Sequence, residues 1–107
     1  MNVATWQGEN RFTIDKVAEP VAGPGQVVVA VRAAGICGTD VHATQGLFPW
    51  KPSLILGHEY TGVIRAVGRG VSKALVGRTV GCEPSYGCGQ CLECAAGRVS
   101  QCPKCVR

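Results

Sequence analysis

The segment "VVVAVRA", residues 27–33, is the most strongly β-branched stretch of the chain. β-Branched side chains pack well on a pleated surface, so this segment predicts a strand. On both sides of it the apolar runs are short, and Gly and Pro interrupt them often. Many short strands with frequent turn signals are typical of an all-β barrel or sandwich. The sequence therefore predicts a mainly β fold.

The other predicted elements are equally short. Apolar or alternating runs predict four further strands, at residues 3–6, 12–17, 63–67 and 79–83. One short helix is predicted over residues 39–45, with Thr39 near its N-cap. Cys82, in the last of these strands, is a candidate free thiol, and the alternative is a small buried residue. A small irregular lobe then carries residues 87–105.

Length and cysteine content limit the class of protein. The 107 residues suffice for one domain. The N-terminus has no basic start followed by an apolar run, and no apolar stretch approaches the length of a bilayer span. In a secreted protein seven cysteines would suggest disulfides; here they suggest thiolates that hold metal in a reducing compartment. We expect a cytoplasmic protein with no membrane partner.

The formal net charge of +4 raises the question of a nucleic-acid partner. The lysines and arginines are scattered along the chain, however, and none of them form a run. Few aromatic residues lie among them. Dispersed charge of this kind is typical of an ordinary surface, so we expect no nucleic-acid partner.

The irregular lobe has metal-ligand spacing. Its cysteines follow the pattern C-x2-C-x2-C-x7-C, at Cys88, Cys91, Cys94 and Cys102. A structural zinc ion is bound by four thiolates at tetrahedral corners, about 2.3 Å from the metal. Two intervening residues let the backbone curl around one ion, and the nearby glycines permit tight turns. Four thiolates fill the coordination sphere, so this site would shape the lobe and would bind no substrate.

Three alternatives remain for these cysteines. They are buried thiols without metal, or they hold an iron–sulfur cluster, since Pro103 follows Cys102 as in the ferredoxin pattern C-x2-C-x2-C-x3-C-P. The gap of seven residues before the last cysteine fits zinc better than that pattern does. Cys105 also forms a C-x2-C pair with Cys102. Spacing alone therefore allows a second zinc-binding set that uses Cys91, Cys94, Cys102 and Cys105.

A second group of candidate ligands lies upstream. The chain has two histidines, in the segments "GICGTDVH" (35–42) and "ILGHEY" (55–60). Cys37, His58 and Glu59 offer the thiolate, imidazole and carboxylate that suit zinc with an open position. The alternatives are a core cysteine and a surface His–Glu pair. Cys37 and His58 are 21 positions apart, so spacing does not show whether they meet.

Three segments together resemble a known family: "AAGICGTDVH" (33–42), "LILGHEYTGVIRAVGRGV" (54–71) and "CGQCLECAAG" (88–97), the last followed by Cys102. They are similar to the zinc-dependent alcohol dehydrogenases of the medium-chain dehydrogenase/reductase superfamily, in particular its polyol and threonine dehydrogenase branches. The resemblance extends over nearly the whole chain and implies the N-terminal, GroES-like catalytic domain, a distorted β-barrel with a small zinc lobe.

The resemblance also implies roles for matching residues. It implies a catalytic zinc bound by Cys37 and His58, with Glu59 as a nearby carboxylate that can bind the metal. It implies that Asp40 hydrogen-bonds the imidazole of His58. Thr39 would take the proton of the alcohol, and His42 would pass it toward solvent. The structural zinc would be held by four cysteines, which are Cys88, Cys91, Cys94 and Cys102.

The resemblance implies a reaction that these residues alone do not complete. The family oxidises an alcohol or polyol with NAD or NADP, and the fingerprint G-x-G-x-x-G of a dinucleotide-binding Rossmann domain is absent from the sequence. We therefore expect a truncated catalytic-domain fragment, inactive alone, of a parent enzyme that is a homo-oligomer. Leu47, Phe48 and Trp50 are candidate substrate-pocket residues. The competing hypotheses are a zinc-stabilised module without catalysis and an iron–sulfur electron-transfer protein.

Overall fold

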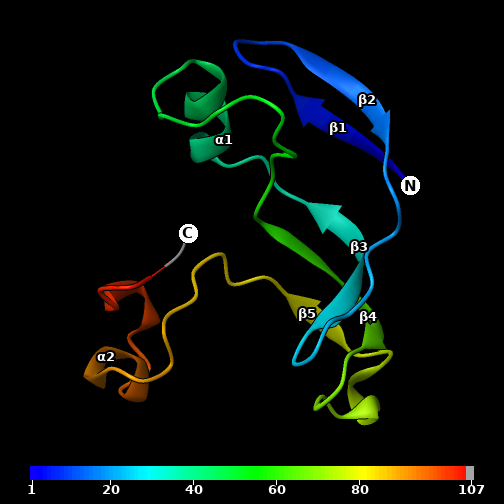
Figure 1. The fold of residues 1–107 in the computed structure, drawn as a ribbon, viewed down its shortest axis with the longest axis vertical. Helices are drawn as coiled ribbons and strands as arrows, with labels where there is room; N and C mark the ends of the chain where they lie inside the picture. The colour runs from blue at the N-terminus through cyan, green and yellow to red at the C-terminus, as the bar shows by residue number, and fades with distance from the viewer. Residues whose placement is uncertain (106–107) are drawn as a thin grey trace.

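The β-branched segment forms one edge strand of a three-stranded antiparallel sheet. In the computed structural model, which describes residues 1–105, it is strand β3 (Val27–Ala34). β3 pairs with β4 (Tyr60–Val67), which pairs in turn with β5 (Thr79–Gly81), so the sheet order is β3-β4-β5 (Figure 1). The mainly β character predicted from the sequence is confirmed.

A separate two-stranded sheet lies at the N-terminus. β1 (Asn2–Trp6) and β2 (Phe12–Lys16) pair antiparallel. Trp6, at the end of β1, is 3% exposed, and its backbone N–H donates to the carbonyl of Leu54 at 2.7 Å. Its own carbonyl accepts the N–H of Ser53 at 2.8 Å. This sheet therefore fixes the segment that leads toward His58.

The helices are few and short. They are α1 (Gly38–Thr44), α2 (Leu92–Ala95) and two 3-10 turns, η1 (Lys73–Leu75) and η2 (Val99–Gln101). The helix predicted from the sequence thus begins one residue earlier, and the N-cap is Cys37 rather than Thr39. The reason is a capping box in which the carboxylate of Asp40 accepts the backbone N–H of Cys37 at 3.0 Å.

The strand boundaries differ from prediction where pairing decides them. β4 begins at Tyr60, three residues before the predicted start, because Tyr60 pairs with Ala34. β5 ends at Gly81, because its three residues are those that pair with β4. Cys82 therefore lies just beyond the strand, half-buried, where its N–H donates to the carbonyl of Tyr60 at 2.9 Å.

The two sheets do not close into a barrel within residues 1–105. β3 and β5 are both edge strands of their sheet, and barrel closure requires every strand to have two neighbours. The molecule exposes 7933 Å², whereas a compact monomer of 11.2 kDa exposes about 5,700 Å². The buried apolar residues among those described are Trp6, Ala43, Ile64 and Cys102. The architecture is thus open, with a small core.

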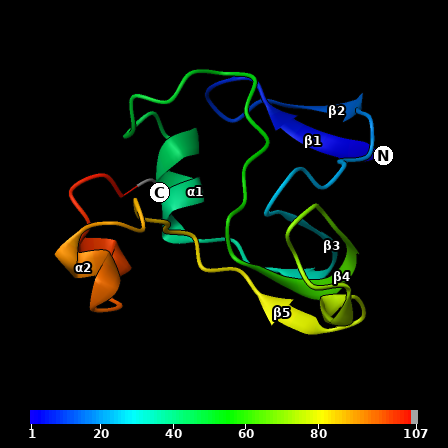
Figure 2. The ribbon, with the colours of Figure 1, turned by 60° about the horizontal axis from the view of Figure 1, so that its bottom comes forward.

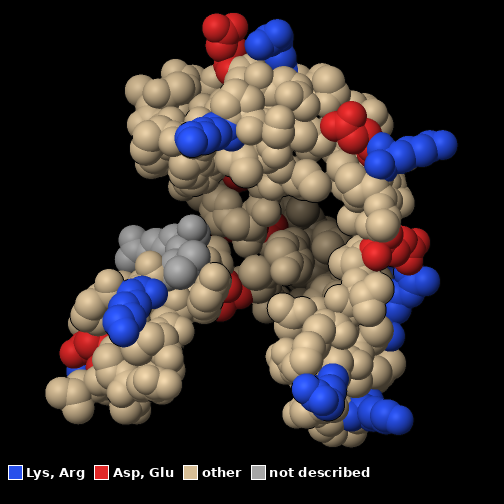
Figure 3. Space-filling model, in the orientation of Figure 1, with Lys and Arg blue, Asp and Glu red and all other residues tan. Residues whose placement is uncertain are grey.

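The cysteine lobe, as we call residues 87–105, stands apart from the three-stranded sheet (Figures 1 and 2). The segment after β5 leads into it. Figure 3 shows the molecule hollowed between the lobe, the sheet and the part that contains α1. On this face the lysines and arginines are scattered over the parts of the molecule and form no large patch. Among the described residues, no helix has the length and apolar character needed to cross a bilayer.

Candidate metal centres

The cysteine lobe gathers four sulfur atoms. The Sγ atoms of Cys88, Cys91, Cys94 and Cys102 all lie within 4.8 Å of one another. Around a tetrahedral zinc ion with bonds of about 2.3 Å, neighbouring sulfurs are about 3.8 Å apart, so the donor set fits one ion. Cys105 is not a member of this group. Of the two sets that the spacing allowed, the structure brings together the one that contains Cys88.

Backbone N–H groups point at these sulfurs. Cys91 is the N-cap of α2, and its Sγ accepts the N–H of Cys94 at 3.4 Å. The Sγ of Cys102 accepts two N–H groups, from Cys88 at 3.4 Å and from Lys104 at 3.3 Å. Such donors stabilise a thiolate over a thiol, and metal binding requires the thiolate.

Gly87 is needed for close approach rather than for a turn. A Cβ atom at this position would lie 2.5 Å from the Sγ of Cys94 and 3.2 Å from the Cβ of Cys102. Real Cβ atoms do not approach other atoms that closely, so any larger residue would push the sulfurs apart. The sequence suggested that Gly87 served a tight turn; its φ lies outside the left-handed region, and its role is steric.

The thiols of the lobe differ in acidity. The backbone hydrogen bond from Cys88 lowers the pKa of Cys102, and burial opposes it. The backbone hydrogen bond from Lys104 also lowers this pKa, which is about 7. A backbone hydrogen bond from Gly89 lowers the pKa of Cys94, but burial and the neighbouring thiols Cys91 and Cys102 outweigh it and raise that pKa to about 11. Cys102 is therefore the first of these two to ionise.

A second set of donors meets beside the end of the β3–β4 pair. The ligand atoms of Cys37, His58 and Glu59 all lie within 4.8 Å of one another, and we call this set the open cluster. Ala34 pairs with Tyr60, and the N–H of Gly35 donates to the carbonyl of Glu59 at 2.8 Å. The chain segments that leave this pair therefore run side by side, which brings residues 21 positions apart together.

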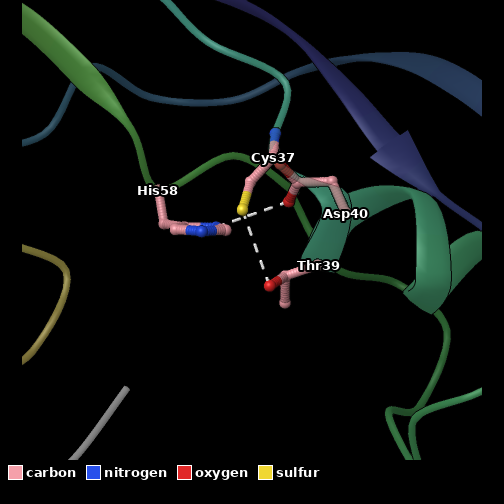
Figure 4. A network of polar contacts seen from close by, with 4 residues as sticks. All are labelled: Cys37, Thr39, Asp40 and His58. Carbon is pink, nitrogen blue, oxygen red and sulfur yellow. Dashed lines mark hydrogen bonds and ion pairs between the residues drawn. The ribbon is translucent and has the colours of Figure 1, made fainter.

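Asp40 links the two protein segments of the open cluster (Figure 4). One of its oxygens, Oδ2, accepts the N–H of Cys37, while Oδ1 lies 3.4 Å from the Nδ1 of His58. The residue is 8% exposed, and Oδ1 is buried without a hydrogen-bond partner. A buried carboxylate oxygen needs a donor, and the imidazole N–H is the one within reach.

Thr39 and His42 occupy different places around α1. The hydroxyl of Thr39 lies 3.6 Å from the Sγ of Cys37, as the dashed line in Figure 4 marks. His42 is exposed, and its ring faces that of Phe48 with centroids 6.4 Å apart. No hydrogen bond joins Thr39 to His42 within the part of the chain that the structure describes. The structure thus brings Thr39 to the cluster and leaves His42 outside it.

A cavity of about 680 Å³ adjoins the open cluster. Thr39, Asp40 and His58 line one side of it. Phe48 and Trp50, which the sequence suggested as pocket residues, also line it, whereas Leu47 is 65% exposed and does not. The wall residues that sequence reasoning missed are Leu54, Ile55, Leu56, Gly57, Pro84 and Ser85. The apolar run directly before His58 was the available signal for three of them.

The chain matches one family model. The model is described as the alcohol dehydrogenase GroES-like domain, and it covers residues 23–107.

Two similar proteins illustrate the relatives. The chain is 37% identical over 101 residues to a sorbitol dehydrogenase of Halalkalibacterium halodurans, a match that covers 94% of this chain and 29% of the relative. It is 42% identical over 94 residues to the starvation-sensing protein RspB of Escherichia coli, which covers 87% of this chain and 28% of the relative. The chain therefore spans less than a third of the length of these curated relatives.

Solved structures have the same fold. A structure from Escherichia coli described as short chain alcohol dehydrogenase (rspB), complexed with NADH, superposes with a TM-score of 0.87 at 37% identity, over 99% of this chain and 31% of that one. Galactitol-1-phosphate dehydrogenase from Escherichia coli superposes with a TM-score of 0.85 at 31% identity, over 98% of this chain and 31% of that one.

Proposed function

Because the chain belongs to the alcohol dehydrogenase GroES-like domain family, we propose that it is the metal-binding part of a zinc-dependent enzyme that oxidises an alcohol or polyol with NAD or NADP. Relatives named sorbitol dehydrogenase and alcohol dehydrogenase support the reaction class. The chain spans about 30% of their length, so the activity belongs to a longer polypeptide of this kind.

The observation that carries the proposal is the open cluster together with Asp40. Its donors are one thiolate, one imidazole and one exposed carboxylate within 4.8 Å of one another. A site of this composition, with fewer than four fixed protein ligands, leaves room for a substrate oxygen. The buried Oδ1 of Asp40 favours a proton on the Nδ1 of His58, which leaves Nε2 as the metal donor.

The cysteine lobe has the opposite role in this proposal. Its four thiolates complete the coordination sphere of one structural zinc, and no position remains for a substrate. The lobe then stabilises the fold and takes no part in the reaction. The division of the chain into a catalytic part and this lobe stays a prediction.

The residues of this chain prepare the alcohol for hydride loss. Zinc, when bound in the open cluster, would act as a Lewis acid that lowers the pKa of an alcohol hydroxyl. Thr39 Oγ1 lies in the cavity wall beside Cys37, where it accepts the proton that the alcohol releases while its own hydroxyl proton moves on toward His42. His42, exposed on α1, passes that proton to solvent. Since no hydrogen bond joins Thr39 and His42 among the described residues, the transfer between them requires an intervening water or hydroxyl.

The hydride acceptor binds elsewhere in the parent enzyme. The 107 residues contain no dinucleotide fingerprint, and one similar structure contains NADH while another contains NADP. We infer that a Rossmann domain outside these residues holds the nicotinamide. A cytoplasmic location and a homo-oligomeric parent stay predictions.

Cobalt substitution tests the proposal. We expect about two Co²⁺ ions per chain, one with the intense thiolate charge-transfer bands of a four-sulfur site and one with mixed sulfur, nitrogen and oxygen donors. His58→Ala is expected to remove the second ion and leave the first. Glu83→Gln, a change in an exposed carboxylate outside both donor groups, is the matched control.

Three outcomes would contradict the proposal. If every bound ion has only sulfur donors, the open cluster binds no metal. Iron with inorganic sulfide would indicate an electron-transfer protein. If His58→Ala changes neither the metal content nor the spectrum, the chain is a zinc-stabilised module without catalysis. A chimera in which this chain replaces the matching segment of the Halalkalibacterium halodurans sorbitol dehydrogenase tests catalysis itself: we expect alcohol-dependent reduction of NAD or NADP that His58→Ala abolishes.

A further inference from the structure

The cavity beside the open cluster has predominantly apolar walls. Six of its lining side chains are apolar, namely Phe48, Trp50, Leu54, Ile55, Leu56 and Pro84. They belong to the loop after α1, to the segment before His58 and to the segment after β5. Three separate parts of the chain thus present apolar side chains to one space next to the proposed metal.

Two stacked aromatic rings form one part of this wall. Phe48 and Trp50 stack with ring centroids 5.3 Å apart and an interplanar angle of 21°. Pro49 lies between them and Pro52 follows shortly after, and proline restricts the backbone of the loop. Trp50 is 36% exposed, so part of its ring surface is available to a ligand.

Most polar side chains of the cavity already have partners or a role in the proposed function, and two polar groups remain. Asp40 is engaged with the N–H of Cys37 and lies beside the imidazole of His58. In the proposed function His58 binds the metal, and Thr39 accepts the proton of the reacting hydroxyl. The hydroxyl of Ser85 and the indole N–H of Trp50 are the two remaining polar side-chain groups in the lining among the described residues. The walls can therefore pair with very few hydroxyl groups beyond the reacting one.

A polyol and a simple alcohol would bind in such a cavity with different affinities. Each hydroxyl of a polyol that enters without a partner loses its hydrogen bonds to water, which disfavours binding. Each methylene of an aliphatic alcohol that leaves water favours binding, by about fourfold in affinity when it is fully buried. An apolar site rejects one added hydroxyl only moderately, by about a hundredfold, so the disadvantage of a polyol grows with the number of its hydroxyls that stay unpaired.

The next inference rests on the proposed function. We propose that the substrate is an alcohol with an apolar carbon skeleton, and that Trp50 and Phe48 select it over a polyol. Relatives carry the names of both substrate kinds, sorbitol dehydrogenase and alcohol dehydrogenase. The lining of this chain favours the second. Trp50 is thus a specificity-determining residue, whose ring covers the carbon chain while the hydroxyl end faces Thr39 and His58.

Ligand titration of the whole 107-residue chain loaded with Co²⁺ tests this inference. The ligands are ethanol, 1-butanol, 1-hexanol and sorbitol, and there are two readouts. The cobalt spectrum reports ligands at the metal, and tryptophan fluorescence reports Trp50, since Trp6 is 3% exposed and lies outside the cavity lining. We expect half-saturation by 1-hexanol at a concentration at least about tenfold below that for ethanol, because a partly open cavity gives about twofold or more per methylene. Sorbitol should bind more weakly than 1-hexanol.

Trp50→Ser removes the ring and adds a hydroxyl. We expect this variant to reduce the dependence of binding affinity on the chain length of the alcohol. It should also reduce the ratio of the affinities for 1-hexanol and sorbitol, as measured from the cobalt spectrum. Leu47→Ser is the matched control, because Leu47 is a neighbouring exposed residue outside the cavity lining, and it should leave both unchanged. Trp6 emission reports whether each variant is folded. Phe48→Ser provides a second variant, with the same expected narrowing, should Trp50→Ser not fold.

The outcomes separate this inference from the proposed function. If the mixed-donor cobalt site forms but sorbitol binds as well as 1-hexanol, or chain length has no effect, the inference is wrong and the proposed function stands. If that cobalt site does not form, the proposed function fails, and Trp50 fluorescence of the chain still decides whether the wall prefers an aliphatic alcohol. Equal losses of the preference for 1-hexanol over sorbitol in Trp50→Ser and Leu47→Ser would also overturn the inference.

Discussion

The cysteine lobe and the open cluster both bring their donor atoms within 4.8 Å of one another, yet they are built in opposite ways. The lobe takes its four sulfurs from 15 consecutive positions, 88–102, and its turns and backbone N–H groups are local. The open cluster takes its donors from both sides of the β3–β4 pair. One site is thus specified along the chain, and the other is specified by strand register.

The difference in donors matches the difference in construction. The lobe offers four soft thiolates, and a zinc ion bound by all four is fully enclosed by sulfur. The open cluster offers three unlike donors and a buried carboxylate that orients one of them. A closed site tolerates little change in any ligand, whereas an open site depends on the groups that hold its ligands in place. Variants of the two sites should therefore fail in different ways.

The largest effect is expected from Cys102→Ser. It removes one of four thiolates, and apparent binding free energies of about 10–16 kcal/mol for structural zinc depend on the complete set. The four-sulfur cobalt bands should disappear, and hydrogen exchange should become fast across the cysteine lobe, while the mixed-donor cobalt site persists.

Cys105→Ser is the matched control for that change. Cys105 lies next to the lobe sulfurs in sequence but outside the four-sulfur group, so the cobalt bands should remain. If Cys105→Ser removes the bands and Cys88→Ser does not, the second ligand set with Cys105 is the one that binds metal.

Gly87→Ala should weaken the lobe by about 1–3 kcal/mol, the usual cost of inserting a methyl group into a filled space. The reason is the 2.5 Å approach of a Cβ atom to the Sγ of Cys94. The measurement is zinc affinity of the lobe by competition with a chelator. Gly81→Ala, where a Cβ would meet nothing within 4 Å, is the control and should change the affinity little. Equal affinities for the two variants would contradict the steric role of Gly87.

Asp40→Asn should weaken metal binding at the open cluster by about tenfold to a hundredfold and leave the lobe unchanged. The amide can still accept the N–H of Cys37 through its oxygen, but its NH₂ group would then face the Nδ1 of His58. That arrangement favours the opposite tautomer, with the proton on the Nε2 that should bind the metal. Imidazole nitrogen NMR shifts report the tautomer, and a change in affinity without a change in tautomer would contradict this account.

The smallest effect is expected within the metal-free, reduced lobe. The pKa of Cys102, lowered from 9.0 to about 7, should be detected in a titration of its Cβ carbon by NMR, with Cys94 ionising far later, at about 11. Because the folded pKa of Cys102 lies below the ordinary value, its ionised form stabilises the metal-free fold in full above pH 9.0, and this contribution is lost as the pH falls through about 7. Identical titrations of the two thiols would contradict the arrangement of N–H donors.

The strands were largely predictable because their signals are local. β-Branched and alternating runs between glycines and prolines indicated five strands at positions within a few residues of those observed. The start of β4 at Tyr60 was missed, since it depends on pairing with Ala34, a contact between distant residues. The N-cap was expected near Thr39 and lies at Cys37. The side chain of Asp40 turns back to accept the N–H of Cys37, which begins the helix earlier.

The sequence by itself determined the lobe. Short spacing between thiols placed a four-thiol site within residues 88–105, but it left two ligand sets open. The structure gathers Cys88, Cys91, Cys94 and Cys102 rather than the set with Cys105. Only the tertiary structure decided that Cys37 meets His58, that Asp40 reaches both segments, and that Trp50 and Leu54 line the same cavity. Those contacts join residues that are far apart along the chain. The distances between them are set by the register of β3 against β4 and by the backbone hydrogen bonds of Trp6, and spacing along the chain reports neither.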